Sequence, residues 1–310
     1  MTAQSRSGDS APILLRVLHE TEYEYDSAVT VSRQLLHLTP RPLPTQKVAS
    51  HRLAVSPGPA EMTAGVDYFG NAFSHAVITT PHRTLTVLAE STVLLQARPA
   101  GAAPVPWETV RDSLAEARIP AVLDAARFLF ESPHVAPSAE LTAYAGPSFP
   151  AGRPLFEAML DLNRRIHDDF EFDPAATTLT TPLDEVLLHR RGVCQDFAHL
   201  MIGCLRSKGL AARYVSGYIL TAPPPGMPRL IGSDASHAWV SVHCPGSAPD
   251  CFEWVDLDPT NDCLLDREHV TLGWGRDFSD VTPMRGVILG GGEQELSVRV
   301  TVTPEVSAPG

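Results

Sequence analysis

A change of residue pattern near residue 100 constrains the fold of this chain more than any other feature of its sequence. Residues 13–96 contain short runs in which apolar and polar residues alternate, separated by Pro, Gly and Asn. Such alternation is typical of strands that bury one face. From residue 107 onward, apolar residues recur every three or four positions, which is typical of amphipathic helices. The sequence therefore predicts an α+β fold with a β-rich first part.

The boundary between the two patterns has the composition of a linker. Residues 97–106 read ARPAGAAPVP and consist mostly of small residues and proline, as is common between domains. We therefore predict a β-rich N-terminal domain over residues 1–100 and a second domain over residues 101–310. The whole chain is 44% hydrophobic and 19% charged, so both parts can bury a core.

The second domain is predicted to begin with helices and to continue with strands. Helical spacing is found at 107–118, 121–132, 153–170, 181–192 and 195–209, and strand-like segments follow at 212–220, 236–243 and 251–258. Gly192 is expected to stop the fourth helix, because glycine is common just after a helix. Residues 295–302 alternate again and predict a C-terminal strand within the 101–310 domain, although the pattern does not indicate to which sheet it belongs.

Cys194 lies where a reactive thiol would be expected. It follows Gly192 by two residues and begins a helical pattern. At a helix N-terminus the dipole and the unpaired N–H groups favour a thiolate, and the Cys194 N–H is available to an oxyanion. The alternative is a buried structural cysteine, which is the commoner role of a single cysteine.

Two strands after Cys194 supply a base and a carboxylate. In 236–243 the apolar residues share one face and His237 lies on the other; in 251–258 Asp258 likewise lies opposite the apolar face. A hairpin through CPGSAPD that turns between residues 247 and 248 sets His237 opposite Asp258 and Val240 opposite Val255. A shift of two residues sets His237 opposite Asp256 instead, so the pattern favours Asp258 only slightly. A carboxylate can orient a histidine that deprotonates a thiol.

The motifs that carry these residues resemble those of a known family. GVCQDFAHL, GLAARYVSGYI, SHAWV and WVDLDPTN are similar to the transglutaminase-like superfamily, and in particular to its bacterial members that are described as candidate cysteine proteases. The resemblance covers about residues 155–263. The TEYEY, LTPRP and DYFGN segments of the first half resemble the N-terminal region that accompanies this domain in bacteria.

The resemblance implies a papain-like or transglutaminase-like cysteine-protease core with a Cys, His, Asp triad. The triad falls on Cys194, His237 and Asp258, which favours Asp258 over Asp256. In the same motifs, we expect Asp196 to hold the loop before Cys194 and Trp239 to form a wall of the cleft.

The net charge and the cysteine content indicate which binding partners and which cellular compartment to expect. The formal net charge is −12 and no Lys/Arg run is present, so neither nucleic acid nor an anionic membrane is an expected partner. The first residues lack an apolar signal-peptide core, no segment reaches membrane-spanning length, and the five cysteines all follow residue 193. These features favour a cytoplasmic protein with at least one free thiol. The spacing of Cys, His and acidic residues suggests neither a zinc nor a calcium site, and no cofactor is expected.

Several other residues are expected to have structural roles. His199 lies five positions beyond Cys194, about 140° around a helix, and is predicted to be a packed or surface residue. Tyr214 and Tyr218 share one strand face and are predicted to pack in the core, and DYFGN is predicted to form a turn. The Pro/Gly-rich segment 221–234 would border the cleft.

The function predicted from these residues and from the resemblance is amide-bond hydrolysis through a thioester, with a peptide, a protein or a small amide as the substrate. A transglutaminase that transfers the acyl group to a primary amine would use the same triad, and it is the first alternative. A non-catalytic interaction module is the second alternative. The preference for hydrolysis rests on the resemblance.

Overall fold

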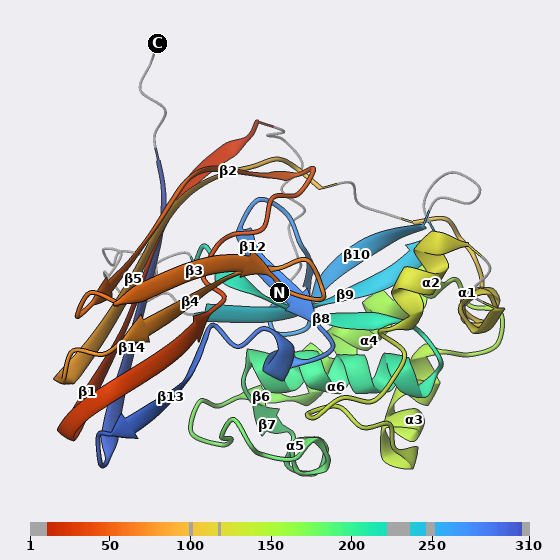
Figure 1. Cartoon of the computed structure of the whole chain (residues 1–310). Helices are drawn as coiled ribbons and strands as arrows, with labels where there is room; N and C mark the ends of the chain where they lie inside the picture. The colour runs from red at the N-terminus through yellow and green to blue at the C-terminus, as the bar shows by residue number, and fades with distance from the viewer. Residues whose placement is uncertain (1–10, 99–101, 117–118, 222–235, 246–251, 306–310) are drawn as a thin grey trace, which may run out of the picture.

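The protein consists of two main β-sheets and a group of helices packed beside the smaller sheet (Figure 1). The computed structural model describes residues 11–98, 102–116, 119–221, 236–245 and 252–305. Strands dominate before the predicted linker and helices follow it, since β5 ends at Leu95 and the first helix begins at Trp107. The predicted α+β class is therefore confirmed.

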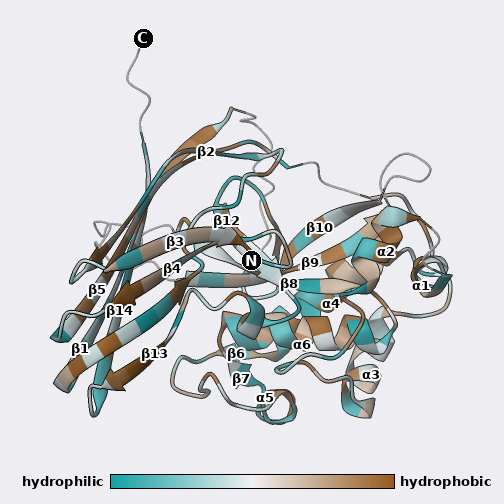
Figure 2. Cartoon of the chain, in the orientation of Figure 1, coloured by the Kyte–Doolittle hydropathy of each residue, from teal (hydrophilic) through white to brown (hydrophobic). Residues whose placement is uncertain are grey.

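The larger sheet has seven strands and is built around one long strand. β1 pairs with β5 and β14 along its first half and with β4 and β13 along its second half, and β2 and β3 lie outside β5 and β4. Brown and teal residues alternate along β1 in Figure 2, as expected for a strand with one buried face. The seven strands are β1 (Ile13–Leu36), β2 (Gln46–Ser56), β3 (Glu61–Val66), β4 (Ala72–Ile78), β5 (His82–Leu95), β13 (Met284–Gly290) and β14 (Gln294–Pro304).

The C-terminal strands belong to this larger sheet, which the sequence pattern of residues 295–302 had left open. β14 runs antiparallel to β1, with Leu15 opposite Pro304 and Tyr25 opposite Gln294. The reason is apolar packing, because Val300 and Val302 are buried in one cluster with Leu15 and Val17. The first and last strands of the chain therefore stabilise each other.

The smaller sheet has five strands in the order β11-β10-β9-β8-β12. They are β8 (Ala212–Ile219), β9 (Ser236–Pro245), β10 (Phe252–Asp258), β11 (Cys263–Leu264) and β12 (His269–Gly275). A further pair of short parallel strands, β6 (Glu171–Phe172) and β7 (Arg191–Gly192), lies before the buried helix α6 (Cys194–Ser207) in the chain. The predicted hairpin turn at 247–248 lies outside the described residues.

The helices cover one face of the smaller sheet, with α6 in contact with β9 and β8. They are α1 (Trp107–Glu116), α2 (Pro120–Ala126), α3 (Ala139–Ala145), α4 (Leu155–Asp169), α5 (Leu183–His189) and α6 (Cys194–Ser207), with short 3-10 turns at Gly146–Ser148 and Phe278–Asp280. α6 is apolar around most of its circumference and is buried accordingly. None of the helices in the described ranges is long and apolar enough to cross a membrane.

The end of α5 differs from the prediction that Gly192 stops this helix. α5 ends at His189, and Arg190 takes the left-handed conformation with φ 57°. Gly192 instead lies in β7, where a Cβ atom would stand 2.7 Å from an Asp196 carboxylate oxygen. Glycine is therefore needed at this position for close approach to α6.

The two sheets are joined by an apolar cluster and a stack of aromatic and guanidinium groups. Tyr218 and Val270 of the smaller sheet pack with Leu15 and Val17 of the larger one. Beside this cluster, the guanidinium groups of Arg41 and Arg213 lie 3.6 Å and 3.7 Å from the ring centroid of Trp274. Arg213 and Trp274 both belong to the smaller sheet, so of these two contacts it is that of Arg41 that links the sheet to the N-terminal region. A desolvated cation–π contact of this kind is worth about 2 kcal/mol.

Candidate active site

Cys194 is the first residue of α6, as the sequence predicts, and its side chain is partly exposed. The loop before it is held by Asp196, whose Oδ2 accepts hydrogen bonds from the Val193 N–H at 2.8 Å and from Thr177 Oγ1 at 2.7 Å. Burial raises the pKa of Asp196, and these hydrogen bonds partly oppose that effect. This contact explains why a carboxylate two residues after Cys194 helps to place the thiol at a helix N-terminus.

His237 and Asp258 are in direct contact. His237 Nε2 lies 2.7 Å from Asp258 Oδ2, and both side chains are buried. The pairing of β9 with β10 differs from the predicted register, because Val240 lies opposite Leu257 and Val242 opposite Val255. Asp258 therefore reaches His237 from a diagonal position. The register prediction was wrong by two residues, but diagonal neighbours on one sheet face remain within side-chain reach.

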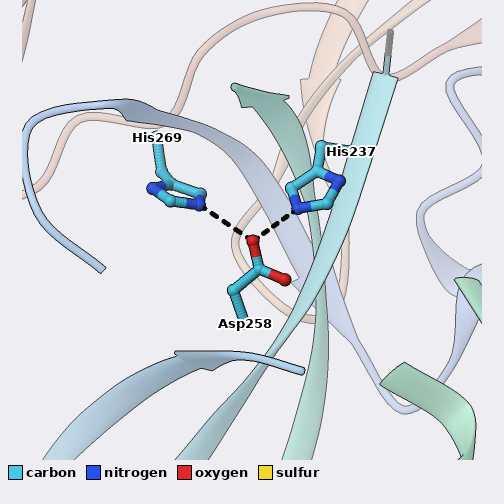
Figure 3. Close-up of side chains that lie close together, drawn as sticks. All are labelled: His237, Asp258 and His269. Carbon is cyan, nitrogen blue, oxygen red and sulfur yellow. Dashed lines mark hydrogen bonds and ion pairs between the residues drawn. The ribbon is translucent and has the colours of Figure 1, made fainter. Parts of the chain in front are cut away.

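Asp258 is surrounded by hydrogen-bond donors. Its Oδ1 accepts from the backbone N–H groups of Thr260 and Asn261 at 2.9 Å and 3.2 Å, and its Oδ2 also accepts from Asn261 Nδ2 at 2.7 Å. His269 Nε2 lies 3.2 Å from the same Oδ2, and Figure 3 shows both imidazoles directed at this oxygen. Burial would raise the pKa of Asp258, but hydrogen bonds from His237 and His269 outweigh it and lower the pKa. The carboxylate therefore stays ionised.

His237 joins the carboxylate to the thiol. Its Nε2 is bound to Asp258 Oδ2, which leaves Nδ1 for the neighbouring Cys194 side chain, and that side chain also raises the pKa of the ring. Burial lowers the pKa of His237, but the hydrogen bonds to Asp258 and Cys194 and their charges raise it to about 10. The imidazole is therefore protonated at neutral pH when it faces a thiolate.

Trp239 does not form the wall of an open cleft, contrary to the expectation. Its side chain is fully buried, and its ring centroid lies 6.1 Å from that of His237 and 5.3 Å from that of His269. Gly217 makes room for it, because a Cβ atom there would lie 2.3 Å from the Trp239 ring. Trp239 thus packs against the imidazole rings of His237 and His269 and restricts their orientation.

Sequence reasoning missed His269 and Asn261 as partners of Asp258. Asn261 lies inside the WVDLDPTN motif, and its position three residues after Asp258 is a signal for a side chain that folds back on the turn. His269 begins β12, whose sequence HVTLGWG has two glycines and little alternation. No strand was predicted there, so no pattern connected His269 with the site.

The three side chains in Figure 3 could also be considered as metal ligands, since one donor atom from each of His237, Asp258 and His269 lies within 4.8 Å of the others. Both histidines, however, approach Asp258 through Nε2 at hydrogen-bond distance. A metal ion bound here would have to displace the protons in the two Nε2–Oδ2 hydrogen bonds. The geometry fits a shared carboxylate better than a metal centre.

The other residues considered from the sequence lie away from this contact. His199 is buried, accepts a hydrogen bond from the Phe278 N–H at 3.2 Å, and has a pKa lowered to about 3 by burial. Tyr214 and Tyr218 are buried as predicted, and Asp67 accepts hydrogen bonds that close the predicted DYFGN turn. Cys251 and most of the 221–234 segment lie outside the described residues.

The other described cysteines differ from Cys194 in their surroundings. Cys204 and Cys244 are buried, and burial raises the pKa of Cys204 to about 12. Cys263 is partly buried, and burial together with nearby carboxylates raises its pKa to about 12 as well. Cys204 and Cys263 therefore carry little thiolate at neutral pH and provide an internal reference for Cys194.

Comparison with known proteins gives the family of the chain. Residues 15–94 match the bacterial transglutaminase-like N-terminal region, and residues 145–259 match the transglutaminase-like superfamily. An uncharacterised protein of Mycobacterium tuberculosis (strain ATCC 25618 / H37Rv) is 45% identical over 295 residues, which is 93% of this chain and 92% of the relative. An uncharacterised protein of Mycobacterium leprae (strain TN) is 30% identical over 292 residues, covering 93% of this chain and 98% of the relative.

A solved structure has the same fold. It is a candidate cysteine protease from Cytophaga hutchinsonii, with a TM-score of 0.74 and 19% identity, and the match covers 97% of this chain and 93% of that one. The fold and family expected from the sequence motifs are thus confirmed. The chain belongs to the transglutaminase-like superfamily and carries the bacterial transglutaminase-like N-terminal region before its core.

Proposed function

We propose that the protein is a cysteine-dependent amide-bond hydrolase, a peptidase or amidase, in which Cys194 is the nucleophile. His237 is the base and Asp258 orients it. The observation that carries this proposal is the contact of His237 Nε2 with the Asp258 carboxylate at 2.7 Å, on a ring whose pKa the neighbouring Cys194 also raises. A nucleophile, a base and an orienting group in this order are the requirement for covalent acyl transfer.

The reaction begins from a thiolate and an imidazolium. The Cys194 sulfur attacks the amide carbonyl carbon, and the backbone N–H of Cys194, in the first turn of α6, is available to the oxyanion. The C–N bond then breaks as the His237 imidazolium gives its proton to the departing amine. The product of this half-reaction is a thioester on Cys194 and a neutral His237.

Hydrolysis follows when a water molecule gives a proton to His237 and attacks the thioester. The acid leaves, the thiolate returns, and His237 is again an imidazolium. Hydrolysis is preferred over amine transfer because water needs no second binding site. The fold shared with a candidate cysteine protease supports the same preference. The substrates that suit this chemistry are a peptide, a protein or a small amide.

The reactivity of the thiol provides the first test. Native protein is treated with iodoacetamide at pH 6, and the labelled cysteines are mapped by mass spectrometry. An ordinary thiol with a pKa of about 8.5 is ionised to only roughly 0.3% at this pH. Cys194 is expected to react much faster than Cys204, Cys244 and Cys263, and His237→Ala is expected to slow its labelling by about 100-fold. His75→Ala, which removes a histidine from β4, is the control and should leave the rate unchanged.

The result of labelling decides between the enzyme and the interaction module. Uniform slow labelling of all cysteines in the wild-type protein would contradict an activated thiol and favour the non-catalytic alternative. If Cys194 is labelled selectively, the protein is next incubated with amide substrates in the presence and absence of a primary amine. Release of free acid in both cases supports hydrolysis, whereas an amine-dependent amide product supports the transglutaminase alternative.

A further inference from the structure

The N-terminal region covers the outer edge of β12 with side-chain amides. β12 is an end strand of the five-stranded sheet. On its free side, Gln46 Nε2 donates to the Thr271 carbonyl at 2.8 Å, and Gln46 Oε1 accepts from the Thr271 N–H at 2.8 Å. Gln46 is 1% exposed. One amide side chain thus satisfies both backbone groups of a residue that a further strand would otherwise pair.

Asn71 repeats this arrangement three residues further along β12. Its Oδ1 accepts from the Trp274 N–H at 2.9 Å, and its Nδ2 donates to the Trp274 carbonyl at 2.8 Å. The intervening Gly273 is in close contact, since a Cβ atom there would lie 2.7 Å from Asn71 Oδ1. Two buried amides from the N-terminal region therefore fix the position of β12 along its length.

His269, at the start of β12, carries this fixed position to Asp258. Its side chain is 2% exposed, and its Nε2 lies 3.2 Å from Asp258 Oδ2. Burial lowers the pKa of His269, although the hydrogen bond to Asp258 opposes this. A neutral ring that contacts a carboxylate through Nε2 must carry its proton there. His269 is thus a hydrogen-bond donor to Asp258, and Trp239 packs edge-on against its ring at 5.3 Å.

The donors around Asp258 come from three places in the fold. Thr260 and Asn261 follow Asp258 directly in the chain, and His237 belongs to the neighbouring strand β9. His269 comes from the opposite edge of the sheet, beyond β8. A donor on a separately anchored strand can fix the carboxylate against movement of its own turn.

We propose that His269 is a positioning residue for the reaction and that the N-terminal region acts on the active site through it. The Gln46 and Asn71 amides hold β12, β12 holds His269, and His269 holds the Asp258 carboxylate against His237. This inference rests on the proposed function, since it assigns a role within the same triad. It also gives the N-terminal region a task in catalysis without requiring it to contact substrate.

A matched pair of amide substitutions tests the role of His269. In His269→Gln the amide nitrogen can occupy the place of Nε2 and donate to Asp258, whereas in His269→Asn it reaches only as far as Nδ1. The measurement is the rate of Cys194 alkylation by iodoacetamide between pH 5 and pH 10. We expect His269→Asn to slow alkylation at pH 6 by about 10-fold, the lower end of the effect of residues that orient a functional histidine. His269→Gln should stay within about twofold of the wild-type protein.

The outcomes separate this inference from the proposed function. Slow, unselective labelling of the wild-type protein would remove the proposed function itself. Selective labelling of the wild-type protein with an equal rate in His269→Asn would overturn the positioning role and leave the proposed function intact. Equal losses in His269→Asn and His269→Gln would also contradict a donor role, because only the first variant lacks the donor. Thermal unfolding of each variant shows whether it is folded.

A double-mutant cycle tests the connection to the N-terminal region. Gln46→Ala is compared with Lys47→Ala, an exposed neighbour on β2, in the wild-type protein and in His269→Asn. We expect Gln46→Ala alone to slow Cys194 alkylation by about threefold and to add no further loss in His269→Asn, because both act on one interaction. Losses that multiply in full, or a rate unchanged by Gln46→Ala, would overturn this part of the inference. The Gln46→Ala comparison also stands if His269→Asn fails to fold.

Discussion

The two main sheets of the molecule are covered to different extents. Along β5 of the larger sheet, buried and partly exposed residues alternate, so one face is in the core and the other meets solvent. In β8 and β9 of the smaller sheet, almost every residue is buried, because α6 covers one face and further strands and loops cover the other. The smaller sheet therefore places polar groups such as His237, Ser241 and His243 away from water.

This difference indicates a division of work between the two sheets. Inside a doubly covered sheet, hydrogen bonds to charged groups are stronger and unpaired polar groups are costlier than at a surface. The pKa of His237 can accordingly be raised to about 10 while Asp258 stays ionised. The larger sheet contributes apolar packing against the smaller sheet and, through Gln46, covers the edge of β12.

The largest effect is expected when the charge inside the smaller sheet is removed. Asp258→Asn places an amide where four residues, His237, Thr260, Asn261 and His269, donate hydrogen bonds to a carboxylate. The substitution also removes the negative charge that raises the pKa of His237. We expect the rate of amide hydrolysis to fall by roughly 10³- to 10⁴-fold, the scale known for neutralising the orienting aspartate of a triad. Steady-state kinetics measure the loss.

The control for this variant is Glu24→Gln, which neutralises an exposed carboxylate on β1 of the larger sheet. Its rate should change by less than about twofold. A loss below about 10-fold in Asp258→Asn would show that the buried carboxylate is not needed, and the proposed division between the sheets would fail.

The second effect concerns packing inside the smaller sheet. In Gly217→Ala the new Cβ atom would lie 2.2 Å from the Val270 carbonyl oxygen and 2.3 Å from the Trp239 ring. Since the backbone must move, we expect a loss of about 3 kcal/mol in the free energy of unfolding, at the upper end for overpacking. Denaturant unfolding measures this loss. Gly58→Ala, in the N-terminal region, meets nothing within 4 Å and should be nearly neutral, so equal losses would contradict the difference in packing.

The same contrast explains what the sequence could predict about the fold. The β-rich nature of residues 13–96 in the larger sheet was predicted because one face of these strands is exposed and the alternation of apolar and polar residues is visible. β12 and β13 were missed, because their sequences HVTLGWG and MRGVILG contain glycines and little alternation. The sheet to which β14 belongs could not be predicted, since its pairing with β1 depends on contacts nearly 300 residues apart in the chain.

The residues of the candidate site could be proposed from the sequence, but the strand register that brings them together could not. Cys194, His237 and Asp258 could be proposed from a helix start, two strand faces and the family motifs. The β9–β10 register was wrong because both registers set apolar residues opposite apolar residues: Val255 meets Val240 in one and Val242 in the other. The role of His269 could not be predicted, because β12 lies at one edge of the sheet and does not pair with β10, the strand that carries Asp258.

The third effect compares a buried histidine from each sheet through its pH dependence. Burial lowers the pKa of His19 on β1 to about 4, so the folded protein takes up the proton less readily than the unfolded chain. Stability contributed by His19 is therefore lost as pH falls from about 6.5 toward 4. His237, with its pKa raised to about 10, has the opposite sign, and its contribution is lost only as pH rises from about 6.5 through 10.

A His19→Gln variant isolates the acid limb of this dependence. Between pH 7 and pH 5 the wild-type protein should lose about 2 kcal/mol more than the variant in the free energy of unfolding. Denaturant unfolding at both pH values measures the difference. An identical pH dependence of the two proteins would show that His19 is not held neutral, and that the bonds of its ring to Tyr218 and Thr21 do not depend on its charge state.

The smallest effect is expected on the wet face of the larger sheet. Arg16 Nε donates to Glu90 Oε1 at 2.9 Å, and the side chains are 53% and 36% exposed. Exposed pairs of this kind contribute about 0.5 kcal/mol, and salt screens them. A double-mutant cycle with Arg16→Gln and Glu90→Gln should give a coupling of this size that vanishes in about 1 M NaCl. A coupling above about 2 kcal/mol that persists in salt would mean that polar contacts stabilise the larger sheet as well. The two sheets would then differ in where their polar groups lie, and not in how much these groups stabilise them.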